Sequence, residues 1–359
     1  MEVKSKNKLP NFQNILFSYL VSDNDANLQR ILLCIIMLCS TWAIQARPFD
    51  VVVARDGSGN FDKISEAVAA APDRSSEKYY IRIKRGTYAE HIRIGTEKTN
   101  LVFVGDGMDV TIITNSRSNH SGYSIFESAT VDVEGDGFIA KGITFMNSAG
   151  PNNGQAVAMK SSSNLSAFYQ CRFKGYQDTL FVDKGLQFYR DSEIYGNTDF
   201  IFGNAAAVFQ NCHIFVLNPT TNHACVITAQ GRVSNDVFTG IVIHKCTIVA
   251  ADGFRKGTKT YLGRPWSSLS TVVILESFLD DLIDPKGWLQ WNRVDPQHSS
   301  LYYGEYGNQG PGADTSRRVK WRGVKILDFT EANKFSVRNF IRGQTWIPFT
   351  NIPFLPDLK

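Results

Sequence analysis

The chain has 359 residues, 43% of them hydrophobic and 20% charged, which is an ordinary globular composition able to bury a large core. Its 38 Lys and Arg against 34 Asp and Glu give a net charge of +4, which is too small for a typical nucleic-acid-binding protein. The sequence also lacks a basic run or an RNA-binding signature, so we expect no nucleic-acid partner.

The N-terminus carries an apolar segment typical of export. Residues 31–44, ILLCIIMLCSTWAI, contain no charge, follow Arg30 and precede QARP. Such a run is short for a membrane span and matches the hydrophobic region of a secretory signal, with cleavage predicted near Ala46. The polar stretch 1–30 is long for a signal peptide, so an uncleaved signal anchor is the alternative. We predict a leader over 1–46, a catalytic domain over 47–359, and secretion.

The next segment predicts one strand and one helix. Residues 49–72, FDVVVARDGSGNFDKISEAVAAAP, begin with a β-branched run, continue through a Gly-rich turn, and end in a helical pattern over about 63–71.

Beyond residue 140 a short pattern recurs: an apolar residue, two variable ones, Cys or Ser, a variable one, and usually another apolar one. The intervals between the Cys or Ser positions are 20–23 residues for the first copies and longer for the last two. The copies are FMNSAG (145–150), FYQCRF (168–173), YRDSEI (189–194), FQNCHI (209–214), IHKCTI (243–248) and ILESFL (274–279).

This repeat predicts an all-β fold, a β-solenoid in which each repeat is one turn of a parallel β-helix. The helix at 63–71 would cap the open end of the solenoid, since a terminal repeat must be covered. The two long intervals predict loops inserted on one side, and the tail from Thr330 to Lys359 is expected along the outside. A β-sandwich is the alternative, but its hairpin dipeptides seldom separate these segments.

Two carboxylates occupy equivalent places in this repeat. Asp178 and Asp199 are 21 residues apart, which places them on neighbouring turns at one angular position, about 5 Å apart. Gln155 precedes Gln177 by 22 residues, so the two amides should join the same ladder. Because two such close carboxylates cannot both ionise freely, one pKa should rise and the other stay low, as a general acid beside a nucleophile requires. Solvated surface carboxylates are the plain alternative.

These residues lie in motifs that resemble those of plant pectin methylesterases, also called pectinesterases, in the short form without an inhibitor-like pro-domain. The motifs occur in the family's order over roughly residues 50–348. They are GTYAE (86–90), GQAVAM (154–159), GYQDTLF (175–181), DFIFGNA (199–205) and YLGRPW (261–266).

The resemblance implies a single-stranded right-handed parallel β-helix and hydrolysis of methyl esters on the galacturonate units of pectin, without metal or cofactor. Asp199 resembles the nucleophile, and Asp178 the acid that protonates methanol and then activates water. Gln177 and Gln155 resemble the donors that stabilise the oxyanion. Arg264 resembles the residue that keeps Asp199 ionised.

Three further residues are predicted to bind sugar. Trp266 resembles a platform under a sugar ring, and Trp288, in GWLQW, is expected to act in the same way. Ser124 stands beside Ile125, where the family often has Thr, and is a candidate substrate contact.

The remaining expectations concern partners and covalent modifications. We expect a monomer in the cell wall that acts on methyl-esterified homogalacturonan and is open to a proteinaceous inhibitor. Asn119 and Asn164 begin N-x-S sequons and are predicted glycosylation sites. Cys212 and Cys246 share one repeat position on adjacent turns, which predicts a disulfide, with two separate buried thiols as the alternative. Scarce, dispersed His and the lack of CxxC indicate no metal site.

Two other kinds of protein fit parts of the sequence. A polygalacturonase would share the β-helix and the tripeptides NTD and RIK, but RIK comes first in this chain and GHG is absent. A pectate lyase would need clustered acidic Ca²⁺ ligands, which the sequence lacks. A wall-binding β-helix that has lost its chemistry is the alternative from another class.

Overall fold

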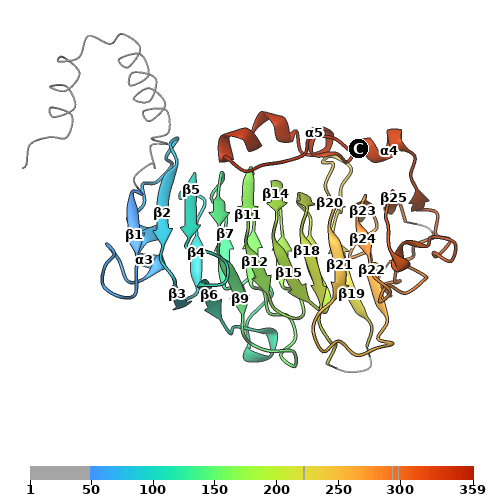
Figure 1. Cartoon of the computed structure of the whole chain (residues 1–359), viewed down its shortest axis with the longest axis horizontal. Helices are drawn as coiled ribbons and strands as arrows, with labels where there is room; N and C mark the ends of the chain where they lie inside the picture. The colour runs from blue at the N-terminus through green and yellow to red at the C-terminus, as the bar shows by residue number, and fades with distance from the viewer. Residues whose placement is uncertain (1–48, 221–222, 293, 298) are drawn as a thin grey trace, which may run out of the picture. The chain divides into compact units, whose positions relative to one another are not determined.

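The computed structural model describes residues 49–359 except 221–222, 293 and 298, and its strands form three parallel sheets (Figure 1). The predicted leader over 1–46 lies outside the described residues. Along the chain, strands enter sheets A, B and C in turn, and each pairs with the strand one turn earlier and one turn later. The fold is therefore the predicted right-handed parallel β-helix.

Sheet A has eleven strands, which are β1 (Val51–Val53), β2 (Tyr79–Ile83), β5 (Leu101–Gly105), β8 (Ile139–Lys141), β11 (Ser166–Tyr169), β14 (Leu186–Arg190), β17 (Ala206–Gln210), β20 (Gly240–His244), β23 (Thr271–Leu275), β25 (Tyr302–Tyr306) and β26 (Val324–Ile326). Sheet B has eight, which are β3 (Gly86–Ala89), β6 (Thr111–Asn115), β9 (Thr144–Asn147), β12 (Arg172–Lys174), β15 (Glu193–Gly196), β18 (His213–Val216), β21 (Thr247–Ala250) and β24 (Phe278–Leu279). Sheet C has seven, which are β4 (Ile92–Ile94), β7 (Val131–Val133), β10 (Met159–Ser161), β13 (Leu180–Val182), β16 (Thr198–Gly203), β19 (Cys225–Gln230) and β22 (Thr260–Gly263).

The sequence repeat corresponds to the corner between sheets A and B. Its first apolar residue points into the solenoid from sheet A, where Phe168, Tyr189 and Phe209 stack with ring centroids 4.7 and 4.4 Å apart. Its last apolar residue points inward from sheet B, where Phe173 pairs with Ile194. Inward residues of the three sheets thus form one continuous core.

The first predicted copy of the repeat is out of register. Phe145 pairs with Phe173 in sheet B rather than with Phe168 in sheet A, so Ile143, not Ser148, occupies the position of Cys171. The cause is a long connection, 148–158, which lies at a different corner and makes the interval before Cys171 longer than one repeat.

The Cys and Ser side chains of the repeat are held by backbone hydrogen bonds. The thiol of Cys246 accepts a hydrogen bond from the N–H of Cys212 at 3.3 Å and donates one to the carbonyl of Phe209 at 3.4 Å. Ser277 in turn accepts the N–H of Cys246 at 3.0 Å. The residue before each Cys or Ser has positive φ, which turns the chain from sheet A to sheet B; these residues are Gln170, Asp191, Asn211, Lys245 and Glu276.

The predicted disulfide is absent from the structure, in which Cys171, Cys212, Cys225 and Cys246 are buried free thiols. Cys212 and Cys246 do lie on adjacent turns, as their pairing strands require. In-register parallel stacking, however, keeps equivalent Cβ atoms about 4.8 Å apart and aimed the same way, whereas a disulfide needs about 3.8 Å and converging vectors.

Segments near both ends of the described residues cover apolar surface of the solenoid. Helix α3 (Ile64–Ala70) buries Ile64, Ala67 and Val68 against the end of the core, which confirms the predicted cap. Glu90 of the GTYAE motif caps this helix by accepting the N–H groups of Ile64 and Ser65.

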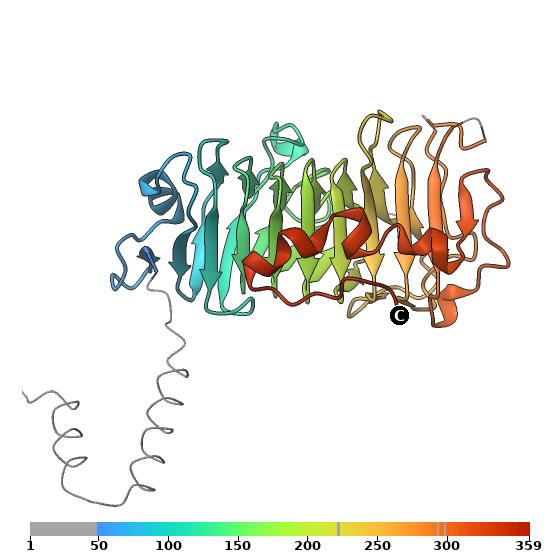
Figure 2. The same cartoon turned by 90° about the horizontal axis from the view of Figure 1, so that it is seen from above.

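The C-terminal segment runs along the outer face of sheet A (Figures 1 and 2). Its apolar residues pack on outward residues of that sheet, including Phe188 and Val242, so the tail lies outside the solenoid as predicted. Its helical parts are α4 (Phe329–Asn333), α5 (Val337–Phe340), η3 (Gly343–Thr345) and η4 (Ile347–Thr350); earlier short turns are η1 (Asn119–Ser121) and η2 (Pro311–Ala313). Within the described residues, no helix is long and apolar enough to cross a membrane.

Candidate active site

The connections from sheet B to sheet C form a groove because their lengths differ. On the two middle turns they are short: residues 175–179, which include Asp178, and the single residue 197, which is followed by the strand that contains Asp199. On the turns before them the connections are 116–130 and 148–158, and on the turns after them 217–224 and 251–259. The long loops therefore form the sides of a groove, and the two carboxylates lie at its bottom.

The structure brings the predicted carboxylates and amides together. Gln177 pairs with Thr198, which sets Asp178 beside Asp199 on the neighbouring turn. The backbone N–H of Ala156 donates to the backbone carbonyl of Gln177, as the N–H of Asp178 does to the carbonyl of Thr198. Gln155 therefore lies one turn from Gln177. A cavity of about 250 Å³ is lined by all four predicted residues together with Arg264 and Trp266.

Both carboxylates sit in left-handed backbone conformations, with φ of 61° at Asp178 and 49° at Asp199. Such a conformation costs a non-glycine residue of order 1 kcal/mol and recurs at functional sites, where packing enforces it. Here it turns both side chains out of the strand ladder and into the cavity, where they are only 6% and 4% exposed.

Arg264 fixes Asp199 by a bidentate contact. Its Nε lies 2.8 Å from Oδ1 and its Nη2 lies 2.5 Å from Oδ2. Behind the guanidinium, the ring of Trp291 stacks with its centroid 4.0 Å from the Arg264 Cζ. Asp199 is therefore held in one orientation, with its outer oxygen lone pairs facing the cavity.

Burial raises the pKa of Asp178 well above its ordinary value, and the negative charge of Asp199 raises it further. Burial also raises the pKa of Asp199, against the hydrogen bonds and charge of Arg264. The expectation of a low pKa for Asp199 is therefore wrong, because desolvation outweighs the ion pair. The two sites still differ: Arg264 bonds directly to Asp199 but acts on Asp178 only through its charge, and the pKa of Asp178 is the one raised well above its ordinary value.

The amides of Gln155 and Gln177 remain unused by the protein. Within the described part of the chain, neither side chain makes a hydrogen bond, although both line the cavity. Two carboxamide groups therefore line the space beside the carboxylates, and amide N–H donors can stabilise charge on a substrate oxygen.

Trp266 and Trp288 differ in exposure. Trp266 is 38% exposed at the cavity, and its ring meets Phe202 edge-on at 5.9 Å. Trp288 is 1% exposed and stacks on Tyr303 inside the solenoid, so its prediction as a sugar platform is wrong. The cause is its pairing with Gly263 in sheet C, which directs the ring inward to a space that a side chain at Gly263 would fill.

Ser124 is also not part of this cavity. Its hydroxyl donates to Glu127 at 2.7 Å in an exposed turn, and the neighbouring Ile125 lines the cavity instead. The substrate contact predicted for Ser124 is thus not supported. The predicted glycosylation sites Asn119 and Asn164 are both exposed, so both remain predictions.

Several aromatic residues of the groove were missed. Trp291 lines the cavity, and Phe126, Phe181 and Phe202 extend the apolar surface beside it, with the rings of Phe181 and Phe202 stacked at 4.4 Å. A usable signal existed, because Phe181 and Phe202 are 21 residues apart, as Asp178 and Asp199 are.

No group of three or more His, Cys, Asp or Glu positioned for a metal ion occurs among the described residues. The fold and the site together define a β-helical protein with a two-carboxylate centre in an open groove. The chain belongs to the pectinesterase family, whose model matches residues 50–344.

Named relatives agree with this assignment. Pectinesterase 2 of Citrus sinensis is 51% identical over 313 residues, which cover 86% of this chain and 61% of that protein. Putative pectinesterase/pectinesterase inhibitor 38 of Arabidopsis thaliana is 49% identical over 86% of this chain and 66% of its own length. The chain thus spans less than two thirds of the length of these relatives.

Solved structures are similar over nearly their whole length. Pectin methylesterase from carrot has a TM-score of 0.83 and 45% identity, covering 86% of this chain and 98% of that one. The enzyme from Aspergillus niger has a TM-score of 0.72 and 32% identity, covering 84% and 96%. This family assignment replaces the polygalacturonase and pectate lyase alternatives.

Proposed function

We propose that the protein is a pectinesterase that hydrolyses methyl esters of galacturonate units in pectin. The observation that carries the proposal is one cavity containing an Arg-fixed carboxylate, a buried protonatable carboxylate and two free amides. We further propose that the protein acts in the plant cell wall after export.

In the first half of the reaction, an oxygen of Asp199 attacks the ester carbonyl carbon. The carbonyl oxygen becomes an oxyanion that accepts hydrogen bonds from Gln177 and Gln155. Collapse of this intermediate breaks the bond to the methoxy oxygen, which takes the proton of Asp178 and leaves as methanol. An anhydride between Asp199 and the galacturonate carbonyl remains.

In the second half, Asp178 is ionised and accepts a proton from water. The resulting hydroxide attacks the galacturonate carbonyl, and the amides again hold the oxyanion. Breaking the anhydride releases the free acid and restores Asp199, which returns to its contact with Arg264. Asp178 is protonated again, so the sum is ester plus water giving acid plus methanol.

The test is methanol release from highly methylated pectin, measured beside the formation of new reducing ends. The wild type should release methanol without new reducing ends. Asp199→Asn should fall below about a thousandth of the wild-type rate while keeping its thermal unfolding temperature. Turnover by Asp199→Asn at a tenth of the wild-type rate would refute the nucleophile assignment. A wild type that makes only reducing ends would refute the esterase.

Asp178→Asn should slow both halves of the reaction, because the amide can neither donate the proton to methanol nor accept one from water. Transfer to an added stronger nucleophile needs less help from a base. Rescue of the second half alone by hydroxylamine would support the two roles assigned to Asp178.

A further inference from the structure

Gln155 differs from the other three carboxylate and amide residues of the cavity in how its backbone is held. Gln177 and Asp178 lie on a short connection, and Asp199 lies within β16. Gln155 instead lies on the long connection 148–158, outside any strand. Its amide makes no hydrogen bond within the described part of the chain, so the placement of its backbone decides where that amide lies.

The neighbouring connection holds this backbone. The carbonyl of Gln155 accepts the N–H of Asn119 at 2.9 Å, and the N–H of His120 donates to the carbonyl two residues before Gln155 at 3.2 Å. Both donors belong to connection 116–130, which forms a side of the groove. Gln155 is therefore positioned only as well as connections 116–130 and 148–158 are fixed against each other.

The buried carboxamide of Asn147 joins these two connections near both of their ends. Asn147 is the last residue of β9 and is 3% exposed. Its Nδ2 lies 2.8 Å from the carbonyl oxygen of Arg117 and 3.2 Å from that of Ser128, near the start and the end of the first connection. In the second connection, the same Nδ2 lies 3.1 Å from the carbonyl oxygen of Val157, and Oδ1 accepts the N–H of Ala149 at 3.0 Å.

These contacts require an amide at position 147. The Nδ2 atom of Asn147 carries two hydrogens and faces three carbonyl oxygens, so one hydrogen is shared between two acceptors. A carboxylate would have nearly the same size but no donor, and a small apolar side chain would leave buried carbonyl oxygens with fewer partners. We therefore expect the donors of Asn147, rather than its volume, to hold the two connections together.

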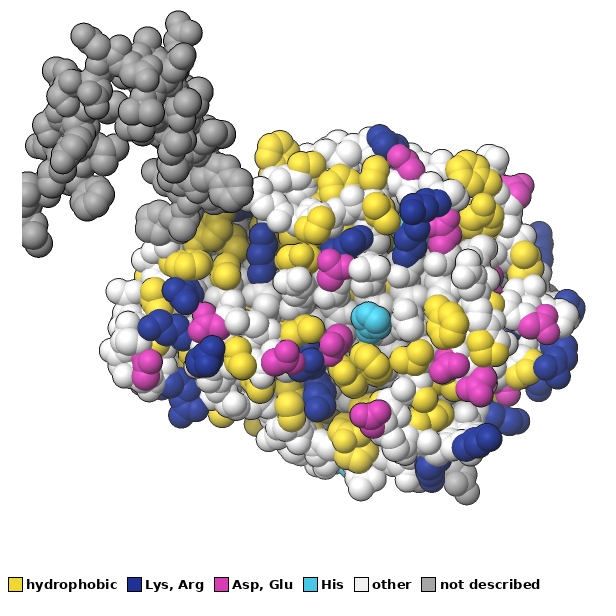
Figure 3. Space-filling view, in the orientation of Figure 1, with side chains coloured by type: hydrophobic (Ala, Val, Ile, Leu, Met, Phe, Trp, Pro, Cys, Tyr) yellow, Lys and Arg dark blue, Asp and Glu magenta, His cyan; other side chains and the backbone are white. Residues whose placement is uncertain are grey.

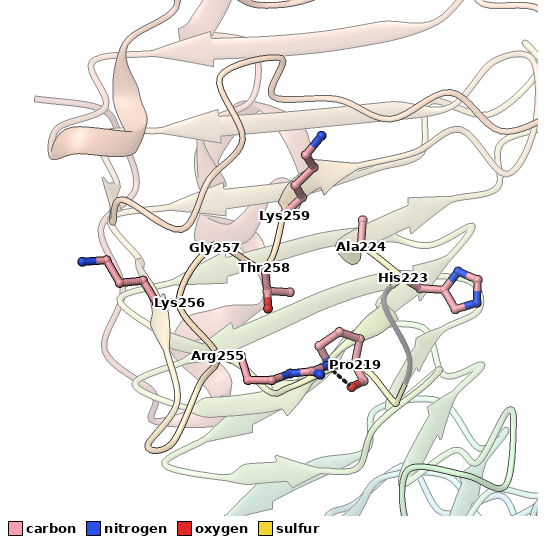
Figure 4. Close-up of a pocket in the computed structure, with 8 residues that line it drawn as sticks. All are labelled: Pro219, His223, Ala224, Arg255, Lys256, Gly257, Thr258 and Lys259. Atoms are coloured by element: carbon pink, nitrogen blue, oxygen red, sulfur yellow. Dashed lines mark hydrogen bonds between the residues drawn. The ribbon is translucent and has the colours of Figure 1, made fainter.

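Connection 148–158 has no charged side chain that could replace this tie. It contains no Lys, Arg, Asp or Glu, although such residues are interspersed over the face of the solenoid seen in Figure 3. On the other side of the groove, an exposed residue joins the long connections: the Arg255 guanidinium donates to the carbonyl of Pro219 at 2.8 Å (Figure 4). Those connections carry none of the carboxylates and amides of the cavity. The buried tie thus occurs where a long connection carries a site residue.

We propose that Asn147 is a positioning residue for the esterase reaction and that it acts through Gln155. The inference rests on the proposed function, since Gln155 serves there as a donor to the oxyanion. Loss of the Asn147 amide frees connection 148–158 from the side of the groove. The Gln155 amide then no longer lies at hydrogen-bond distance from the oxyanion, although Gln177, Asp178 and Asp199 keep their places on the neighbouring turns.

The test is a double-mutant cycle on methanol release from highly methylated pectin. Asn147→Ala should lower kcat about 10- to 100-fold, because a displaced oxyanion donor contributes little. In the Gln155→Ala background the same substitution should change kcat by less than about threefold, since the donor through which it acts is gone. Equal fold-changes in the two backgrounds would overturn the proposal.

Two further variants test the role of the donors. Asn147→Asp should lower kcat at least as much as Asn147→Ala, and wild-type kcat in Asn147→Asp would overturn the proposal. If Asn147→Ala does not fold, Ser128→Ala provides a milder change, because it removes the hydroxyl that accepts the N–H of Val157 at 3.3 Å. Its effect on kcat should be about two- to fivefold in the wild type and absent in the Gln155→Ala background.

The matched control is Asn308→Ala. Asn308 also joins neighbouring turns through its carboxamide, but at the corner between sheets A and B: Nδ2 donates to the carbonyl of Ile274 at 3.1 Å, and Oδ1 accepts the N–H of Ser277 at 3.0 Å. Asn308→Ala should lower the unfolding temperature yet leave kcat unchanged in both backgrounds. A fall in kcat like that of Asn147→Ala would indicate a general effect of lower stability and would overturn the proposal.

Hydrogen exchange separates this inference from the proposed function. If the wild type released no methanol from any pectin, the proposed function would fail, and exchange would still decide whether Asn147 holds the connection. The amides of Ala156 and Val157 should exchange about tenfold faster or more in Asn147→Ala than in the wild type, and at the wild-type rate in Asn308→Ala. Unchanged exchange in Asn147→Ala would overturn the role assigned to Asn147.

Discussion

On the two middle turns, two corners have the same positive φ but serve different purposes. At the corner from sheet A to sheet B, positive φ occurs at Gln170 and Asp191, among others, and the Cys or Ser that follows is buried and fully hydrogen-bonded. Between sheets B and C, positive φ occurs at Asp178 and Asp199, whose side chains enter a cavity beside two amides that have no hydrogen-bond partner among the described residues. A positive φ therefore accompanies hydrogen-bonded side chains at the first corner and, at the second, the carboxylates for which we propose a chemical role.

The largest expected effect separates two glutamines. Gln177→Ala removes the oxyanion donor that we propose, so kcat should fall about 10²- to 10³-fold. Gln170→Ala, at the other corner, removes an exposed amide from the same backbone conformation and should leave kcat unchanged. Steady-state methanol release measures both. A comparable loss in the two variants would show that the backbone corner, not the amide, carries the effect.

The next effect separates two tryptophans. Trp288→Ala empties a fully buried site and should lower the free energy of unfolding by about 3–5 kcal/mol, measured by denaturant titration. Trp266→Ala should change stability little but raise the KM for pectin, since that ring borders the cavity. A raised KM for Trp288→Ala with unchanged stability would contradict the structure.

A smaller effect concerns pH and stability. Because the folded state raises the pKa of Asp178, its ionisation opposes folding above that pKa, and the opposition disappears on acidification below the ordinary value of 3.8. Asp178→Asn should therefore raise the unfolding temperature at pH 7, on the order of 2–4 °C, and the gain should shrink as pH falls.

The matched control for Asp178→Asn is Asp191→Asn, which changes a surface carboxylate that pairs with Arg190. It should shift the unfolding temperature by less than about 1 °C at any pH. A gain for Asp178→Asn that grows on acidification would reverse the sign derived from burial.

The smallest expected effect is that of a reducing agent on the unfolding temperature. With four free thiols in the described residues, a reducing agent should leave the unfolding temperature unchanged, and thiol titration after denaturation should detect all four. Cys246→Ser should cost less than about 1.5 kcal/mol, because Ser277 already makes the same contacts one turn later. A lower unfolding temperature under reduction would instead support the predicted Cys212–Cys246 disulfide.

The sequence predicted those features that depend on spacing alone. The 21-residue interval located Asp178 against Asp199 because both turns have short connections, so a difference in numbering equals one turn of the solenoid. The same reasoning failed at Ser148, where a long connection falls within the turn. Spacing also could not show which way a side chain points: Trp288 is directed inward by its pairing with Gly263, and Ser124 bonds to Glu127.

Energies proved harder to predict than positions. The sequence motif identified the pairing of Arg264 with Asp199, but the balance between that pairing and burial depends on packing around the carboxylate. The disulfide failed for a similar reason, since the turn count was right while the direction of two Cβ vectors decided against a bond.

The single-residue connection at Asn197 has a consequence for how such a protein can change in length. A solenoid accepts a duplicated turn wherever both new interfaces match, and a turn inserted before β9 or after β23 would leave the two carboxylates, the two amides and Arg264 in place. A turn inserted between β13 and β16 would separate Asp178 from Asp199 by a further strand spacing of about 4.8 Å. A duplicated turn is therefore compatible with this site near the ends of the solenoid, but not between the two turns that carry Asp178 and Asp199.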